Sequence, residues 1–169
     1  MSVLLLGCGA SKTINHRTAG ADYTSALVTL DIDPTTNPDF LWDLNDLPYP
    51  FEDGSFDEVH AYEVLEHCGS QGDWRFFFAQ FQELWRILKP RGRLIFTVPA
   101  PHSPWVWGDP GHTRHIHPAQ LPFLLQTQYD IQVGKTAMTD YRHVYSADFH
   151  MLDLSLMGDT LFCILEAKK

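Results

Sequence analysis

The sequence predicts an α/β fold, a doubly wound and mostly parallel sheet that closes with an antiparallel β-hairpin. Two apolar runs near the start, 3–6 and 26–31, end in a glycine turn and in a carboxylate, as buried parallel strands often do. An amphipathic helical pattern follows at 73–89, and two strand-like runs flank Met157-Gly158-Asp159 near the end. Strands that alternate with crossovers imply three layers, α-β-α, and 169 residues predict a single domain, 1–169.

In the first half of the chain, strands are predicted at 3–6, 26–31 and 56–62, and a short strand or extended segment at 40–43. Residues 11–25 give weak support for the usual crossover helix, because Asn15, Gly20 and several Ser and Thr residues interrupt any apolar stripe. A short turn of helix or a loop is expected there. Residues 34–38 are predicted to form a loop, and 44–55, with two prolines and Asp53-Gly54, a turn-rich connector.

In the second half, the clearest helix is predicted over 73–89, with Asp73 as its N-cap. Pro90 and Gly92 are expected to end it before a strand over 93–98. Residues 100–111 are predicted to form a long loop, and residues 118–126 a helix capped by His117. The hairpin is expected to pair 148–156 with 160–167.

Composition narrows the class of partner. The chain carries 21 acidic and 12 basic residues, a net charge of −9, so nucleic acid is not expected as its main partner. Three cysteines without paired spacing favour a reducing, cytoplasmic location over a disulfide framework or a thiolate zinc site. No run is long enough to span a bilayer, so no membrane association is expected.

The glycine turn and the acid define a predicted ligand site. In a parallel sheet, the turn Gly7-Cys8-Gly9 and Asp31 meet at the carboxyl ends of neighbouring strands. Backbone approaches a nucleotide-like ligand closely at glycines, and a carboxylate accepts hydrogen bonds from ribose hydroxyls. A tight turn and a solvated loop acid would account for the same residues.

Five segments in order resemble the class I S-adenosylmethionine-dependent methyltransferases, specifically small Rossmann-like domains of the type 11 kind. They are Leu6-Gly7-Cys8-Gly9; Thr29-Leu30-Asp31-Ile32-Asp33-Pro34; the segment from Asp43 through Asp57; Val64-Leu65-Glu66-His67; and Leu84 to Pro99. The resemblance covers about 3–125, and the hairpin matches the family's last two strands.

The resemblance implies S-adenosylmethionine as cofactor, S-adenosylhomocysteine as product, and methyl transfer to an acceptor that we expect to be a small molecule. The cofactor-binding positions that it implies are Gly7, Cys8, Gly9, Asp31, Ile32, Asp43, Leu44, Tyr62 and Glu63. Asp43 matches the acid near the adenine amine, with Leu44 beside the ring. Tyr62 and Glu63 fall where the family lines the pocket and the acceptor's approach.

Two other functions stay open. A nucleotide-dependent oxidoreductase is the more distant, because the third glycine of a dinucleotide fingerprint is replaced by Lys12 and the helix that should hold a pyrophosphate is poorly supported. A sulfonium cofactor has no phosphate and tolerates both changes. The nearer alternative is a cofactor-binding module that is non-catalytic or depends on a partner.

No catalytic residue is assigned, because methyl transfer from a sulfonium needs a general base only if the acceptor must lose a proton. His67, His102 and His112 are the candidate bases. His112, His115 and His117 lack the spacing of a helical zinc site, so no metal is expected. Trp105 and Trp107, on the loop after the fifth strand, either recognise the acceptor or fix the loop to the core.

Overall fold

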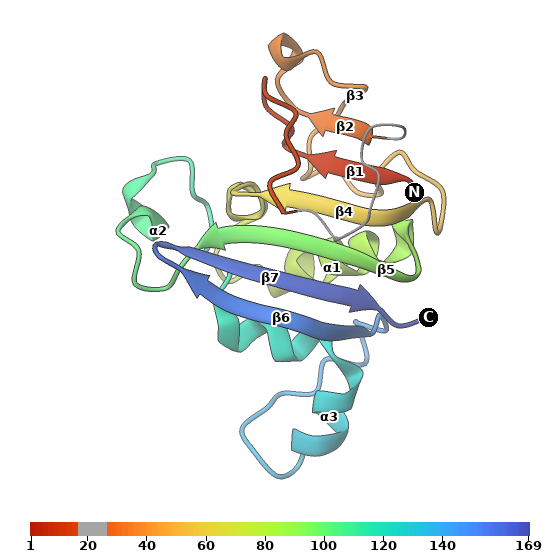
Figure 1. Cartoon of the computed structure of the whole chain (residues 1–169). Helices are drawn as coiled ribbons and strands as arrows, with labels where there is room; N and C mark the ends of the chain where they lie inside the picture. Colours follow the sequence, from red (N-terminus) through yellow and green to blue (C-terminus); the bar gives the residue numbers. More distant parts are fainter. Residues whose placement is uncertain (17–26) are drawn as a thin grey trace.

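The computed structural model describes residues 1–16 and 27–169, and this part of the chain forms one seven-stranded sheet (Figure 1). The strands are β1 (Val3–Leu6), β2 (Leu27–Asp31), β3 (Phe40–Leu41), β4 (Phe56–Tyr62), β5 (Leu88–Pro99), β6 (Phe149–Met157) and β7 (Thr160–Ala167). Their order is β3-β2-β1-β4-β5-β7-β6, with the first five parallel and β7 antiparallel to both of its neighbours. The predicted α/β sheet with its C-terminal hairpin is confirmed.

The described helices are α1 (Trp74–Ile87), α2 (Trp105–Gly108) and α3 (Gln126–Gln132), with 3-10 turns η1 (Pro34–Thr36), η2 (Leu65–His67) and η3 (Pro118–Leu124). Side chains of α1 and η3 share the main core with alternate residues of β1 and β5. Figure 1 shows α1 behind the sheet. The opposite face of β1 carries a smaller cluster of Val3, Leu5, Cys8 and Ile14. A short turn of helix or a loop was predicted over 11–25; residues 11–16 contain no helix, and 17–25 lie outside the described residues, as does Ala26, the predicted first residue of the second strand.

The predicted N-cap of the long helix is confirmed, because the Asp73 side chain accepts a hydrogen bond from the Phe76 N–H at 3.0 Å. The predicted boundary after this helix is wrong. Strand β5 begins at Leu88, which pairs with Phe56, and the pairing resumes at Glu58 with Arg93. The intervening residues form a bulge, with Arg91 at φ +64°. Pro90 and Gly92 therefore lie within a bulged strand and do not mark the end of the helix.

The helix predicted over 118–126 is also different in form. His117 caps it as expected, but Pro118–Leu124 is a 3-10 helix that contains Pro122. A separate helix, α3, follows after the extended residue Leu125. Proline has no N–H to donate and disfavours an α conformation before it, which explains why one regular helix does not form. The predicted loop 100–111 also contains the single helical turn α2.

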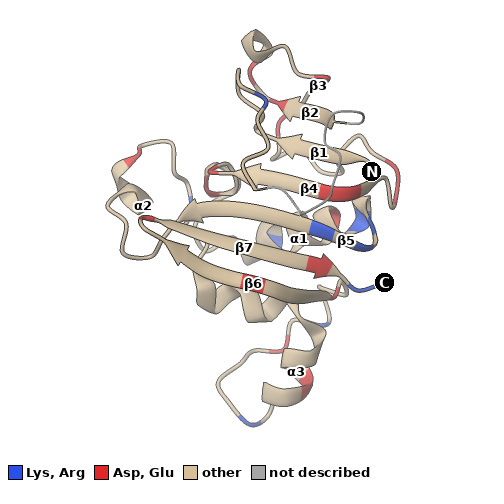
Figure 2. Cartoon of the chain, in the orientation of Figure 1, with Lys and Arg blue, Asp and Glu red and all other residues tan. Residues whose placement is uncertain are grey.

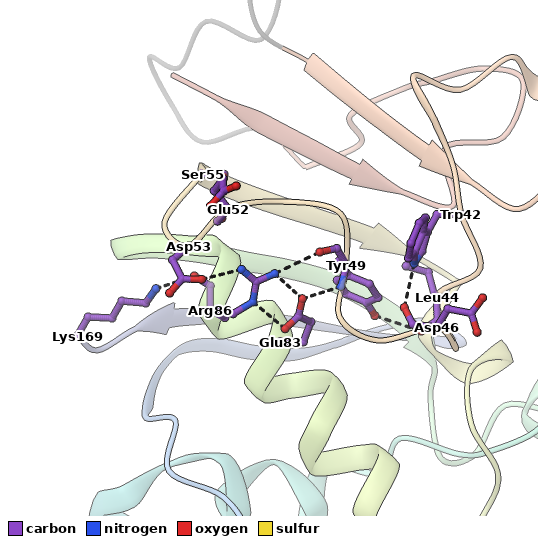
Figure 3. Close-up of polar contacts among 10 residues, drawn as sticks. All are labelled: Trp42, Leu44, Asp46, Tyr49, Glu52, Asp53, Ser55, Glu83, Arg86 and Lys169. Carbon is purple, nitrogen blue, oxygen red and sulfur yellow. Dashed lines mark hydrogen bonds and ion pairs between the residues drawn. The ribbon is translucent and has the colours of Figure 1, made fainter.

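A polar network fixes the connector between β3 and β4 onto α1 (Figure 3). The Arg86 guanidinium donates to both carboxylate oxygens of Glu83, at 2.8 and 2.6 Å, and to Asp53 at 2.7 Å. Glu83 in turn accepts the Tyr49 N–H at 2.7 Å, and the buried Tyr49 hydroxyl donates to the Leu44 carbonyl. The connector is thereby fixed to the last turns of α1. Among the described residues, no helix is long and apolar enough to cross a membrane.

Candidate functional site

The site lies where the strand order changes direction, between β1 and β4. From β1 the chain proceeds outward through β2 and β3, and then returns to place β4 and β5 on the other side of β1. The carboxyl ends of parallel strands leave a crevice at such a position. The loops that follow β1, β2, β3 and β4 all contribute residues to one pocket there.

The glycine turn after β1 needs its glycines for two separate reasons. Gly7 has φ +58°, and a Cβ added there would lie 2.5 Å from Val64 Cγ2, so a side chain would collide with the segment after β4. Gly9 has φ +54°, but a Cβ there would meet no atom within 4 Å. Gly7 therefore permits close packing between two loops, whereas the backbone at Gly9 faces open space.

Asp31, at the end of β2, is held by this turn. Its Oδ2 accepts the Gly9 N–H at 2.8 Å, and its Oδ1 accepts the Asp33 N–H at 2.9 Å. The residue is only 9% exposed. Each carboxylate oxygen has two acceptor positions, so both retain capacity for a ligand donor. The structure places the acid beside the glycine turn, as the sequence predicted.

The opposite wall comes from the start of the connector. Asp43 Oδ1 accepts two hydrogen bonds from Asn45, one from its backbone N–H and one from its side-chain amide, each at 2.8 Å. The Asn45 amide oxygen accepts the Gly69 N–H at 2.7 Å, which ties this wall to the segment after β4. Asn45 was not predicted as a site residue, although it lies two residues after Asp43.

Five of the predicted positions line this pocket together: Gly7, Asp31, Ile32, Asp43 and Leu44. The pocket also includes residues that the sequence did not point to, namely Trp42, Asn45, Val64 and Cys68, and it includes His67. Ile32 is 63% exposed, an unusual position for a large apolar side chain at the rim of a pocket.

The other predicted cofactor positions lie elsewhere. The Cys8 side chain is buried in the small cluster on the opposite face of β1, and Tyr62 packs against that cluster. The Tyr62 hydroxyl interacts with His60 Nδ1 at 2.6 Å and accepts the His16 N–H. Glu63, at φ +50°, lines a second pocket. Gly9 contributes through its hydrogen bond to Asp31.

The second pocket adjoins the first, because His67 lines both. Its lining includes Glu63, Glu66, His112, Asp109 and Trp105, with further residues from the end of β5 and from the start of β7. The His67 and His112 rings lie edge to face with centroids 4.7 Å apart, and His112 Nε2 is 3.9 Å from Glu66 Oε1.

Glu66 is the most unusual acid of this pocket, being 1% exposed. Burial, reinforced by the negative charge of Glu63, raises the pKa of Glu66 to about 8. Perturbed acids in a cleft are common at functional sites. This burial could not be predicted from the sequence, because it depends on contacts of η2 with the distant segment 111–114.

The remaining histidines are separated from this cluster. His102 is exposed, with its ring 4.0 Å from Asp159. His115 lines a different pocket beside α1, and His117 caps η3. Of the three candidate bases, the structure brings together His67 and His112 only. Trp105 and Trp107 are 60% and 63% exposed, so neither fixes the loop to the core, and Val106 is the buried residue between them.

The charge around the two pockets is negative. Asp31 and Asp43 line the first pocket, and Glu63, Asp109 and Asp159 line the second, where the raised pKa of Glu66 leaves that acid largely uncharged at pH 7. Figure 2 shows Lys and Arg gathered instead around the start of β5 and the C-terminus, at the opposite end of the sheet. A positively charged ligand is favoured at the site, and a phosphate is disfavoured.

Comparison with known proteins gives the family. A family model described as a methyltransferase domain matches residues 4–96, more than half of the 169 residues. The chain belongs to this methyltransferase domain family. The resemblance to class I methyltransferases that the five sequence segments indicated is confirmed. No curated protein sequence matches this methyltransferase domain.

Solved structures share the fold of this methyltransferase domain at low identity. A chain in the complex between the Haloferax volcanii Trm112 methyltransferase activator and the putative methyltransferase has a TM-score of 0.63 at 18% identity, covering 99% of this chain and 83% of that one. A SAM-dependent methyltransferase from Archaeoglobus fulgidus gives 0.59 at 14%, covering 98% and 85%. The N-methyltransferase NodS from Bradyrhizobium japonicum WM9, in complex with S-adenosyl-L-homocysteine, gives 0.59 at 15%, covering 99% and 78%.

Proposed function

We propose that this domain is an S-adenosylmethionine-dependent methyltransferase that acts on a small-molecule acceptor. The observation that carries the proposal is the acid-lined pocket to which Gly7 of the glycine turn, Asp31 and Asp43 all contribute. The carboxylate of Asp31 is oriented by Gly9 before any ligand binds. The family match and the similar solved structures support a methyltransferase function.

The residues present fit this cofactor. Asp31 would accept hydrogen bonds from the ribose hydroxyls, and Asp43 would lie near the adenine amine, with Leu44 beside the ring. The exposed side chain of Ile32 would cover an apolar ring face, which explains its position at the rim. The open backbone at Gly9 leaves room for the methionine part. Cys8 would act through its backbone, since its side chain is buried on the other face.

When bound, the cofactor supplies a methyl group that is already activated on a sulfonium. The residues of this chain then have to orient the acceptor and exclude water. Acceptor entry through the second pocket would bring it past Glu63 and Trp105, and His67 lies between the two pockets. His67 and His112 are the groups positioned to hold a proton from the acceptor.

The same geometry argues against a dinucleotide. The acids of both pockets would repel a pyrophosphate, and η2 and η1 are too short to provide a phosphate-binding helix terminus. Lys12 adopts φ +47° at the position of the third fingerprint glycine, and its ammonium group donates to the Asn37 carbonyl. The net charge of −9 also disfavours nucleic acid as the acceptor. The buried free thiols Cys8, Cys68 and Cys163 suit a reducing, cytoplasmic location.

Calorimetry with S-adenosylhomocysteine, S-adenosylmethionine and NAD tests the proposal. Binding of the two adenosyl ligands at micromolar concentrations, without binding of NAD, is the expected result. Micromolar NAD binding with no response to the adenosyl ligands would overturn it. Methyl transfer is then followed with labelled cofactor and cell-extract metabolites as acceptors.

A partner-dependent methyltransferase is the second candidate. It is favoured by one observation, the similarity to a chain from a complex whose name includes a methyltransferase activator. The labelled-methyl assay distinguishes a methyltransferase that is active alone from one that depends on a partner. Turnover by the purified chain alone contradicts dependence on a partner, whereas cofactor binding without turnover, restored by cell extract, supports it.

A further inference from the structure

We propose that Glu66, His67 and His112 form a binding site for a divalent transition-metal ion of the Zn²⁺ type. One potential ligand atom from each residue lies within 4.8 Å of the others. The set spans the segment after β4 and the segment before η3, so it exists only in the folded chain.

The Glu66 carboxylate lacks the partners that a buried acid normally has. In the described part of the chain, neither of its oxygens has a hydrogen-bond partner and its ion-pair neighbour is His112, at 3.9 Å. The charges of Glu63 and of the buried Arg114 guanidinium also act on Glu66, but neither group forms an ion pair with it. His112 is also buried at its side chain, 7% exposed, with Nδ1 unpartnered. Buried carboxyl groups normally have hydrogen-bond partners or coordinate a metal, because an unpartnered buried polar group is costly. A cation between Glu66 Oε1 and His112 Nε2 would give the Glu66 carboxyl group a partner.

His67 is held in the tautomer that a metal ligand needs. Its Nδ1 lies 2.9 Å from the Gly111 carbonyl oxygen. A carbonyl only accepts, so Nδ1 carries the proton, and Nε2 presents a lone pair. Ligating histidines commonly donate their other ring N–H to a backbone carbonyl in this way, which fixes the ring.

The fold assembles the three residues through backbone contacts. Thr113 N and Arg114 N both donate to the Glu66 carbonyl, at 3.0 and 3.2 Å, and the buried Arg114 side chain donates to the Leu65 carbonyl. A Cβ at Gly111 would lie 3.2 Å from His67 Nδ1, so a glycine allows the loop to approach the ring. These contacts place His112 over η2.

The donor set indicates the class of ion. Two imidazoles and one carboxylate suit Zn²⁺, Co²⁺ or Fe²⁺, whereas Mg²⁺ and Ca²⁺ prefer oxygen ligands. Three protein ligands leave at least one coordination position open, as in catalytic sites. The second pocket, which these three residues line, is where that position would be filled.

The ion would give the second pocket a preference for acceptors with an oxygen ligand. A hydroxyl that coordinates a divalent ion loses its proton more readily, and the oxygen that remains can then attack the methyl group while S-adenosylhomocysteine leaves. With the ion bound, His67 and His112 serve as ligands instead of bases, so the proton passes to water. This preference rests on the proposed function, but binding of the ion does not.

Metal binding is tested on the full chain after dialysis against a chelator. Titration with Co²⁺, followed by its visible absorption, and displacement by Zn²⁺ should show one site per chain, and Mg²⁺ should not compete. Glu66→Gln, His67→Gln and His112→Gln should each weaken Co²⁺ binding at least tenfold. His115→Gln is the matched control, because it removes a partly buried histidine of the same segment that lines another pocket; it should bind as the unaltered chain does.

Absence of Co²⁺ binding, or binding that all three substitutions leave unchanged, would overturn the proposal. His67 is exposed, so its variant folds even if the Glu66 variant does not, and it then decides the outcome. S-adenosylhomocysteine binding is measured separately on the metal-free chain. Metal binding without S-adenosylhomocysteine binding would contradict the proposed function and support the ion site. S-adenosylhomocysteine binding without metal binding would support the proposed function and overturn the ion site.

Discussion

Asp31 Oδ2 accepts a hydrogen bond from Gly9 N at 2.8 Å, so the glycine turn after β1 and the acid after β2 form one unit. The other oxygen of the carboxylate accepts from Asp33 N at 2.9 Å. The acid is thus oriented before a ligand binds, and little side-chain entropy remains to be lost on binding.

Replacing this acid should weaken cofactor binding. We expect Asp31→Ala to reduce S-adenosylhomocysteine affinity by more than about 1.5 kcal/mol, because hydrogen bonds to a charged acceptor are lost. Calorimetry measures the change. Asp46→Ala, which removes an exposed acid from the nearby connector, is the charge-matched control and should bind normally. Unchanged affinity in the Asp31 variant would mean that the ribose does not bind there.

The two glycines of the turn should differ in their tolerance of alanine. We expect Gly7→Ala to lower the free energy of unfolding by about 2–3 kcal/mol, since it adds a collision with Val64 to the strain of a positive φ. Gly9→Ala meets no atom and should cost only about 1 kcal/mol. Urea unfolding measures both.

A double substitution isolates the collision at Gly7. Val64→Ala removes the Cγ2 atom that a new Cβ would meet at 2.5 Å. Combined with Gly7→Ala, it should recover part of the lost stability, so the two changes should be non-additive. Strict additivity would show that backbone strain alone accounts for the effect.

The network around Arg86 should depend on the guanidinium and not only on its charge. We expect Arg86→Lys to lower the free energy of unfolding by about 1–2 kcal/mol, because Lys lacks the planar fork that meets Glu83 and leaves that buried acid poorly paired. Arg86→Ala should cost more. Thermal and urea unfolding measure this, and Arg91→Lys, at an arginine that is 86% exposed, is the control. Equal effects of Arg86→Lys and Arg91→Lys would contradict the role of the fork.

Asp57 should contribute to stability in a defined pH range. Burial alone would raise its pKa, but hydrogen bonds from Lys89 and Ser2 outweigh burial and lower the pKa of Asp57 to about 2. A carboxyl with a depressed pKa stabilises the fold above its unfolded pKa of about 4, and the contribution disappears as the pH falls through about 2.

Asp57→Asn should therefore lower the free energy of unfolding at pH 7 by about 1 kcal/mol, a value discounted because the side chain is 36% exposed. The difference from the unaltered chain should shrink between pH 4 and pH 2. Chemical unfolding across this range measures it, with Glu52→Gln in the exposed connector as control. A difference that stays constant with pH would contradict the assignment.

Much of the fold could be predicted because local patterns carry it. The apolar run 3–6, the N-cap Asp73 and the alternating runs around Gly158 are each short-range signals, and each appears as expected. The predictions that were wrong involve Pro90, Gly92 and Pro122, which usually end regular structure. There the sheet pairing of Leu88 with Phe56 and the packing of η3 overrode the local preference.

The candidate site also has some features that the sequence predicts and others that depend on the tertiary structure. The sequence by itself determined that a glycine turn and an acid would meet, because parallel strands bring their carboxyl ends to one edge. Only the tertiary structure decided that Cys8 and Tyr62 face the opposite side of the sheet, and that His112 lies beside Glu66 and His67. The physical reason is the separation along the chain between the residues that are in contact. The positions of the strands along the chain follow from local periodicity. The burial of Glu66 depends on backbone hydrogen bonds from Thr113 and Arg114, which no local pattern reveals.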